Sequence, residues 1–222
     1  VRRNPFQIEY VPWIARVYAY PFERWSGMGK QVLFGSPNFL LFYLYQRAGL
    51  LRAVGEFRYL HNEQWKRIQF DARNTQFSAL YMKAFRLGYE PHIAALADAL
   101  CPDKGVVYDI GSNWGWLSLL LASRPGFAGS IHAFEPYPPS FRDLTSTVTQ
   151  AGLASSIECH NLALSDEAGN VRMRLPDSFQ SGQAAIEDVA CGAGDTLARA
   201  LDSMQLPPPD FIKIDVEGGE IE

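Results

Sequence analysis

The chain has 222 residues, 47 % of them hydrophobic and 20 % charged, a globular composition that excludes a disordered or fibrous protein. Its length suits one large domain, or one domain with an appendage, because domains average about 150 residues. The net charge of −4 argues against a general nucleic-acid binder, which needs excess Lys and Arg to neutralise phosphates. The charge is unevenly spread, since residues 1–60 carry eight Lys and Arg against three Glu.

Cysteine usage and hydropathy predict the setting of the protein. Cys101, Cys159 and Cys191 are too few and too scattered for a disulfide framework, and no spacing of His, Cys and Asp residues predicts a metal site. The longest apolar run, residues 39–45, is far shorter than the roughly 20 residues that cross a bilayer. We therefore expect a cytoplasmic protein with reduced thiols and no transmembrane segment.

The first hundred residues are rich in aromatic side chains. Apolar residues recur there at spacings of three and four over residues 39–54 and 77–100, which predicts helices. Aromatic residues at helical spacing predict packing against the body of the protein. The positive charge of this segment would also suit a cap over an acceptor pocket, a dimer surface or contact with an anionic membrane face.

From residue 105 onward, short β-rich runs alternate with helical ones. Strands are predicted over 106–110, 130–134, 156–160 and 211–216, helices over 114–122, 139–151 and 195–204, and an additional strand over 170–175. This alternation predicts βαβ units and a mostly parallel sheet with flanking helices. The predicted fold class is thus α/β: a mainly helical segment over residues 1–100 precedes a Rossmann-like core over residues 101–222.

The first motif follows the strand at 106–110. Asp109 ends this apolar strand, and Gly111 and Gly115 follow in the turn that opens the next helix. Ligands of open α/β sheets bind beyond the carboxyl ends of the strands, where a glycine lets the backbone approach them. The spacing Asp-x-Gly-x-x-x-Gly differs from the Gly-x-Gly-x-x-Gly pattern for a pyrophosphate. An acid in the first position suits a cationic or zwitterionic ligand, or anchors the loop.

Two further strands also end in acids. Glu135 ends the strand at 130–134, twenty residues after Gly115, a separation at which acids commonly bind ribose hydroxyls. Asp215 and Glu217 sit at and just beyond the end of the strand at 211–216, and they precede paired glycines. This strand is expected beside the first one, which places Asp215 next to the Gly111 loop. Such carboxylates could orient a ligand, act as a general base or bind a divalent cation.

Four motifs together resemble the FkbM family of S-adenosylmethionine-dependent methyltransferases. The resemblance covers roughly residues 70–222 and includes Tyr89-Glu90-Pro91 ahead of the first strand. It implies a class I methyltransferase fold, S-adenosylmethionine as cofactor and methyl transfer to a hydroxyl of a sugar, glycan or natural product. The motifs are Asp109-Ile110-Gly111-Ser112-Asn113-Trp114-Gly115, Ala133-Phe134-Glu135-Pro136, Ala163-Leu164-Ser165-Asp166 and Ile212-Lys213-Ile214-Asp215-Val216-Glu217-Gly218-Gly219-Glu220.

The resemblance also implies roles for individual residues. Glu135 would hold the ribose hydroxyls, Asn161 would approach the adenine, and Asp215 would lie next to the reacting sulfonium. By their place in the sequence, Asp215 and Glu217 are the first candidate bases, ahead of His160 and His92. The residues on the methionine and ribose side would be Asp109, Gly111, Asn113 and Gly115.

The chain departs from the family at Ser112, where Ala is usual, and at Trp114, where Ile or Val is frequent. Trp114 is bulky enough to alter the wall of the pocket. The chain also ends directly after the strand at 211–216, although this fold class ordinarily adds further strands. We expect the natural protein to continue, and this strand to be an exposed edge prone to pairing.

Three functions are compatible with the sequence. The first is O-methylation of a small-molecule or glycan hydroxyl, and the second is a nicotinamide-dependent oxidoreductase, against which the absence of the pyrophosphate fingerprint weighs. The third is a non-catalytic module that retains the fold. The sequence does not define the acceptor or the oligomeric state.

Overall fold

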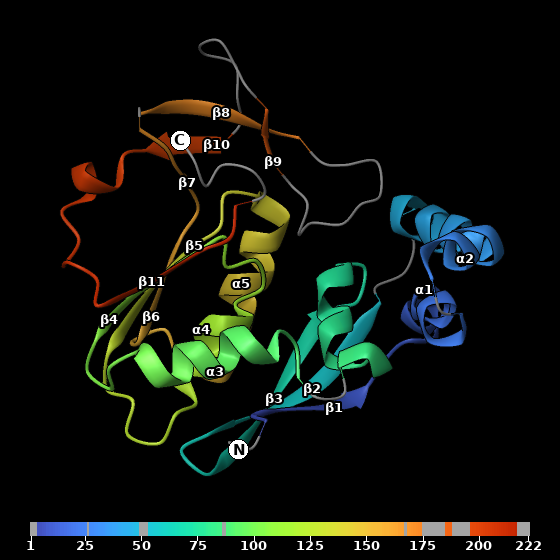
Figure 1. Cartoon of the computed structure of the whole chain (residues 1–222), viewed down its shortest axis with the longest axis horizontal. Helices are drawn as coiled ribbons and strands as arrows, with labels where there is room; N and C mark the ends of the chain where they lie inside the picture. Colours follow the sequence, from blue (N-terminus) through green and yellow to red (C-terminus); the bar gives the residue numbers. More distant parts are fainter. Residues whose placement is uncertain are drawn as a thin grey trace.

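The structure is a computed structural model (Figure 1). It describes residues 4–25, 27–48, 53–85, 88–166, 168–174, 185–187 and 196–216. Cys191 and Glu217, both singled out in the sequence, lie outside these residues.

A parallel four-stranded sheet forms the centre of the fold. It consists of β4 (Val106–Ile110), β5 (Ser130–Phe134), β6 (Ile157–His160) and β11 (Phe211–Ile214), in the order β11-β4-β5-β6. All its pairings are parallel. Numbered along the chain within the sheet, this order is 4-1-2-3, the arrangement around the switch point of a Rossmann fold. The predicted α/β class and the pairing of the last strand with the first are confirmed.

One face of this sheet packs against helices. These are α3 (Pro91–Leu100), α4 (Trp116–Ala122) and α5 (Pro138–Ala151). Val107, Ile131 and Ala133 point to this face and share a buried cluster with Leu117 and Leu144 from the helices. Strands that are covered on both faces need near-continuous apolar sequence, which is why the run at 106–110 is so hydrophobic.

The opposite face packs against residues that come after β6 in the chain. Tyr108, Ile110 and Phe134 pack there against Leu201 and Met204 of the 3₁₀ helix η4 (Leu201–Met204). A second sheet follows in the order β7-β10-β8-β9. Its strands are β7 (Ala163–Leu164), β8 (Gly169–Arg174), β9 (Ala185–Glu187) and β10 (Thr196–Arg199).

The strand expected over 170–175 is confirmed by β8, whereas the helix expected over 195–204 is wrong. Residues 196–199 form β10, in which buried and exposed residues alternate, and only 201–204 form a short 3₁₀ helix. These residues form a strand because β10 has a partner on each side, β7 in parallel and β8 in antiparallel orientation. The alternation of residues along it has the two-residue period of a strand.

The N-terminal segment contains an antiparallel sheet that the sequence analysis missed. β1 (Phe6–Tyr10), β2 (Val54–His61) and β3 (Gln64–Asp71) pair in the order β1-β2-β3. The hairpin between β2 and β3 turns at Asn62 and Glu63, whose φ angles are +48° and +61°. Two positive φ angles match the strand twist in a two-residue hairpin turn. The expectation of a mainly helical segment is corrected to this extent.

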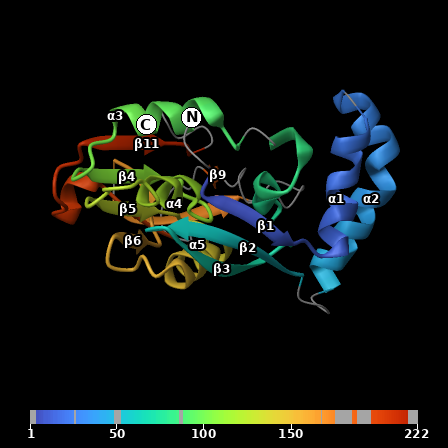
Figure 2. The same cartoon turned by 90° about the horizontal axis from the view of Figure 1, so that it is seen from below.

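Two helices lie side by side at one end of the molecule (Figure 2). They are α1 (Trp13–Arg24) and α2 (Met28–Ala48). The shorter elements η1 (Thr75–Leu80) and η2 (Lys83–Phe85) lie against α1. Many large apolar side chains of α1 and α2 are exposed, among them Trp13, Met28 and Leu33. The expected burial of the N-terminal aromatic residues therefore holds for Phe6 and Phe57 in the sheet but not for Trp13.

The β2–β3 hairpin binds the carboxyl ends of two core helices. The Tyr59 hydroxyl donates to the Leu119 carbonyl at 2.9 Å, and His61 Nδ1 lies 3.1 Å from the carbonyl oxygen of Ala122, the last residue of α4. Lys66 Nζ donates to the carbonyl of Ala151, the last residue of α5, at 2.5 Å. The contacts to Ala122 and Ala151 reach carbonyls at the helix ends that a helix leaves unpaired, whereas the Leu119 carbonyl also accepts the Ser123 N–H. The Lys66 cation complements the helix dipole.

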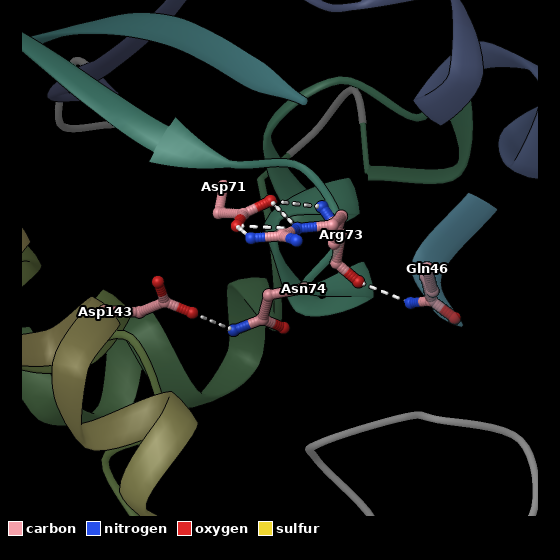
Figure 3. A network of polar contacts seen from close by, with 5 residues as sticks. All are labelled: Gln46, Asp71, Arg73, Asn74 and Asp143. Atoms are coloured by element: carbon pink, nitrogen blue, oxygen red, sulfur yellow. Dashed lines mark hydrogen bonds and ion pairs between the residues drawn. The ribbon is translucent and has the colours of Figure 1, made fainter. Parts of the chain in front are cut away.

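A polar network joins α2, the segment after β3 and α5 (Figure 3). Asp71 forms an ion pair with Arg73, whose carbonyl accepts a hydrogen bond from Gln46 of α2 at 2.6 Å. Asn74 Nδ2 donates to Asp143 of α5 at 2.7 Å. Burial raises the pKa of Asp143 to about 6. The network therefore ties the N-terminal helices to the core through polar as well as apolar contacts.

The parallel sheet has an edge at β11. Among the described strands β11 pairs only with β4, and Ile212 and Ile214 are 43 % and 55 % exposed. The predicted exposed edge is confirmed for the part of the chain that the structure describes. Within the same residues, no helix combines the length and the apolar character needed to cross a bilayer.

Candidate functional site

The carboxyl ends of β4, β5 and β11 meet at one edge of the parallel sheet. Gly111, Glu135 and Asp215 each follow the last residue of one of these strands. The Gly111 N–H donates to the Phe134 carbonyl at 3.0 Å, and the Asp215 N–H donates to the Ile110 carbonyl at 3.1 Å. The predicted convergence of the three strand ends is confirmed, at the switch point where ligands of such sheets bind.

Gly111 is required by the neighbouring strand end. Its φ angle is +73°, and a Cβ atom there would lie 1.9 Å from the main-chain oxygen of Asp215. No real Cβ contact is that short, so a side chain at Gly111 would force β11 away from β4. The sequence analysis attributed this glycine to the approach of a ligand. The structure shows that β11 itself makes the close approach.

Asp109 is fully buried below the loop. Its Oδ2 accepts a hydrogen bond from the Ser118 hydroxyl at 2.6 Å, and its Oδ1 has no hydrogen-bond partner. Lys213 Nζ lies 3.6 Å from Oδ1, donates to the Gly111 carbonyl at 2.9 Å and lies 3.4 Å from Asp215 Oδ2. The sequence analysis expected Asp109 to face a cationic or zwitterionic ligand or to anchor the loop, and in the structure the cation beside it is Lys213 of the chain itself.

Glu135 is buried and anchors the same loop. Its Oε2 accepts the Asn113 N–H at 2.8 Å and its Oε1 accepts the Tyr137 N–H at 2.9 Å. Burial raises the pKa of Glu135 to about 7, although the two N–H donors oppose the shift. Each carboxylate oxygen keeps a free lone pair, so the two bonds leave capacity for a further donor. Asn113 has a φ angle of +49°, and its buried Oδ1 has no hydrogen-bond partner.

Two residues of the first motif serve packing away from this edge. A Cβ at Gly115 would lie 2.8 Å from Leu144 of α5, so this glycine allows α4 and α5 to approach. Trp114 is 3 % exposed, and its ring contacts those of Phe6 and Phe77. The expectation that Trp114 alters the pocket wall is therefore wrong. Its ring points into the core shared with the N-terminal sheet.

Asn161 and Asp215 are the exposed members of the predicted set. Asn161 follows β6, and its Nδ2 donates to the carbonyls of Glu135 and Pro136 at 2.8 and 3.2 Å. The Asp215 side chain is 55 % exposed. Both side chains can be reached from solvent beside the convergent strand ends.

Glu90 joins the site although the sequence analysis gave it no role. It precedes α3 with a φ angle of +42°, and its pKa is raised by burial and by the nearby charge of Asp215. The sequence signal was its place directly before Pro91, a proline that can begin a helix and so puts Glu90 at the helix start. Among the residues that the structure describes, the Lys213 cation lies beside Asp109 and Asp215 and also acts electrostatically on Glu90 and Glu135. This excess of acid suits a cationic ligand.

Comparisons with known proteins find one curated relative, a methyltransferase. No family model matches the chain. The hexuronic acid methyltransferase AglP of Haloferax volcanii is 29 % identical over 129 residues, which are 54 % of this chain and 48 % of AglP. The chain therefore spans about half the length of this curated relative.

Two solved structures are more distant. Methyltransferase FkbM from Methylobacillus flagellatus KT is 19 % identical, with a TM-score of 0.36, covering 92 % of this chain and 42 % of that one. P. horikoshii TYW2 in complex with MeSAdo is 15 % identical, with a TM-score of 0.31, covering 60 % and 50 %. At such scores the fold assignment rests on the strand order described above. The chain is similar, over half its length, to a sugar-acid methyltransferase.

Proposed function

We propose that the protein is an S-adenosylmethionine-dependent methyltransferase that modifies a hydroxyl of a sugar or glycan. The observation that carries the proposal is the convergence of Gly111, Glu135 and Asp215 at the switch point of a Rossmann-like sheet. The similarity to AglP supports methyl transfer over the redox and non-catalytic alternatives.

The residues at this edge fit a zwitterionic nucleoside. Asn113 Oδ1 is buried without a partner and could accept from a ligand amine. Glu135 keeps acceptor capacity for ribose hydroxyls, and exposed Asn161 could meet the adenine. The carboxylates outnumber Lys213, which favours a ligand with a positive charge.

S-adenosylmethionine, when bound, supplies a methyl group on a sulfonium whose positive charge is lost as the methyl leaves. The protein then has to align the acceptor and to accept the proton of its hydroxyl. We assign the proton to Asp215, which is exposed beside the strand ends and held by Lys213 at 3.4 Å. Asp109 acts from below as a positioning residue, since it contacts Ser118 and Lys213 but not solvent. Glu217 remains a second candidate base.

The acceptor is proposed from the curated relative, which is a hexuronic acid methyltransferase. A uronic acid, free or within a glycan, is therefore the first acceptor to test. Incubation with S-adenosylmethionine should add one methyl group, detected by mass spectrometry.

Calorimetry separates the three functional alternatives. We expect S-adenosylhomocysteine to bind and NAD not to bind. Binding of NAD alone would support the oxidoreductase, and binding of neither would support the non-catalytic module. For the site itself, Asp215→Asn should weaken the binding of S-adenosylmethionine more than that of S-adenosylhomocysteine, because only the former carries a positive charge on sulfur. Asp202→Asn, at an exposed acid of η4, is the matched control.

A further inference from the structure

Three potential metal ligands meet on the central sheet, away from the loop at Gly111. His132 lies on β5, and Glu158 and His160 lie on β6. His132 pairs with Glu158 and Phe134 pairs with His160 in the parallel register, so all three ligand side chains share one face. This is the face of Tyr108 and Phe134, opposite the face that packs against α4 and α5.

The distances between the ligand atoms match a tetrahedral metal site. His132 Nδ1 lies 3.1 Å from His160 Nε2 and 3.4 Å from Glu158 Oε2, and His160 Nε2 lies 3.8 Å from Glu158 Oε1. Ligands at about 2.0–2.2 Å from a tetrahedral Zn²⁺ are separated from one another by about 3.3–3.6 Å. The two Glu158 separations involve different oxygens of its carboxylate; with one ligand atom taken from each residue, all three atoms lie within 4.8 Å of one another.

The two imidazoles are held in place by their surroundings. The His160 ring stacks on Phe134 at 4.7 Å and on His132 at 5.4 Å, and His132 contacts the Tyr108 ring edge-on at 5.4 Å. The histidine side chains are 7 % and 12 % exposed, whereas that of Glu158 is 64 % exposed. Ligands fixed by packing do not have to be ordered when a metal binds. The exposed Glu158 leaves the cluster open to solvent on one side.

We propose that His132, Glu158 and His160 form a binding site for a divalent transition-metal ion of the Zn²⁺ class. Two imidazoles and one carboxylate are the donor set that suits Zn²⁺, and a water molecule would take the fourth position. The ion would link β5 to β6 next to their carboxyl ends. Since it binds only the folded arrangement, it would stabilise the protein. This site does not depend on the proposed methyl transfer.

Zinc titration of chelator-treated protein tests the proposal. We expect one Zn²⁺ per chain by calorimetry and a rise in Tm with added Zn²⁺. Mg²⁺ at the same concentration should give neither effect, because it prefers oxygen ligands. A stoichiometry of zero at millimolar Zn²⁺ would overturn the proposal.

Variants assign the ligands. Loss of an outer partner of a ligand already weakens metal binding by about 10–100-fold, so His132→Gln and His160→Gln should each weaken it by more than about 100-fold. His92→Gln, at an exposed histidine of α3, is the matched control and should bind like the wild type. Cys159→Ser tests the thiol that lies between two of the ligands in sequence, and should also keep binding.

Cobalt spectroscopy of the wild-type protein tests the same ligands without variants, in case the variants fold poorly. Co²⁺ in the wild-type protein should give the intense visible bands of tetrahedral coordination without a thiolate charge-transfer band. Binding that survives both histidine substitutions, or a spectrum that shows thiolate coordination, would refute the site.

Discussion

The main-chain oxygen of Asp215 occupies the space that a side chain at position 111 would need, with only 1.9 Å to the place of a Cβ atom. The two proposed site residues are therefore coupled through the backbone. The loop after β4 and the end of β11 can lie together only while residue 111 is glycine.

The first prediction concerns this contact. Gly111→Ala should lower the free energy of unfolding by several kcal/mol, because it combines a positive φ with a backbone clash. Gly126→Ala is the control, since Gly126 has a φ of +85° but nothing within 4 Å of a Cβ. It should cost only about 1–2 kcal/mol, the penalty of the left-handed conformation. Denaturant unfolding measures the stability of both variants. Equal losses of stability would show that the contact with the Asp215 oxygen adds nothing to the cost of the left-handed conformation.

The second prediction concerns the ion pair beneath the loop. Lys213→Met should destabilise the protein by about 3–5 kcal/mol, because it leaves Asp109 buried without its cation. Asp109→Asn together with Lys213→Met should lose less than the sum of the single changes, with a coupling energy of about 0.5–3 kcal/mol. Lys104→Met, at an exposed lysine, is the control. Additive losses in the double-mutant cycle would contradict the pairing.

The third prediction concerns pH. The folded-state pKa of Glu135 is about 7, above its ordinary value of 4.5, so the folded protein binds this proton more tightly than the unfolded chain. The resulting stabilisation is complete below pH 4.5 and is lost as the pH rises through 7. Over that window it amounts to about 3 kcal/mol.

Glu135→Gln should remove this part of the pH dependence, which unfolding curves between pH 4.5 and 7.5 would measure. Asp143→Asn provides the comparison, because the pKa of Asp143 is also raised, to about 6. The contribution of Asp143 to stability is therefore lost over a lower pH range than that of Glu135. Parallel pH profiles for wild type and Glu135→Gln would show that Glu135 titrates normally.

The fourth prediction concerns the aromatic core. Trp114→Ala should destabilise the protein by about 3–5 kcal/mol, because the indole packs against Phe6, Phe57 and Phe77. Trp13→Ala should change stability by no more than about 0.5 kcal/mol, since Trp13 is 61 % exposed. Thermal or chemical unfolding distinguishes the two, and similar losses would place Trp13 in a packed interface.

The positions of the site residues could be predicted from the sequence immediately around them. Gly111, Glu135 and Asp215 directly follow apolar β-rich runs, and parallel strands bring their carboxyl ends to one edge. The residue types at strand ends therefore predicted which side chains would meet. The binding and catalytic roles of these residues remain predictions.

The partners of these residues could not be predicted because they depend on register and on distant packing. Lys213 meets Asp109 only because β11 pairs with β4 in one particular register. Trp114 looked like a pocket residue because nothing near it in the sequence indicates that it packs against Phe6 and Phe57, which lie 57 or more residues before it. His132 and His160 are 28 residues apart, and only adjacent strands bring their rings into contact.

The β2–β3 hairpin has a consequence for engineering. Through Tyr59, His61 and Lys66 it holds the far ends of α4 and α5, the two helices whose opposite ends begin beside the loop at Gly111. Substitutions in the hairpin can therefore change the rigidity of both helices at a distance, without altering any side chain at the strand ends. The hairpin is thus the place to adjust thermal tolerance while the residues of the candidate site stay unchanged.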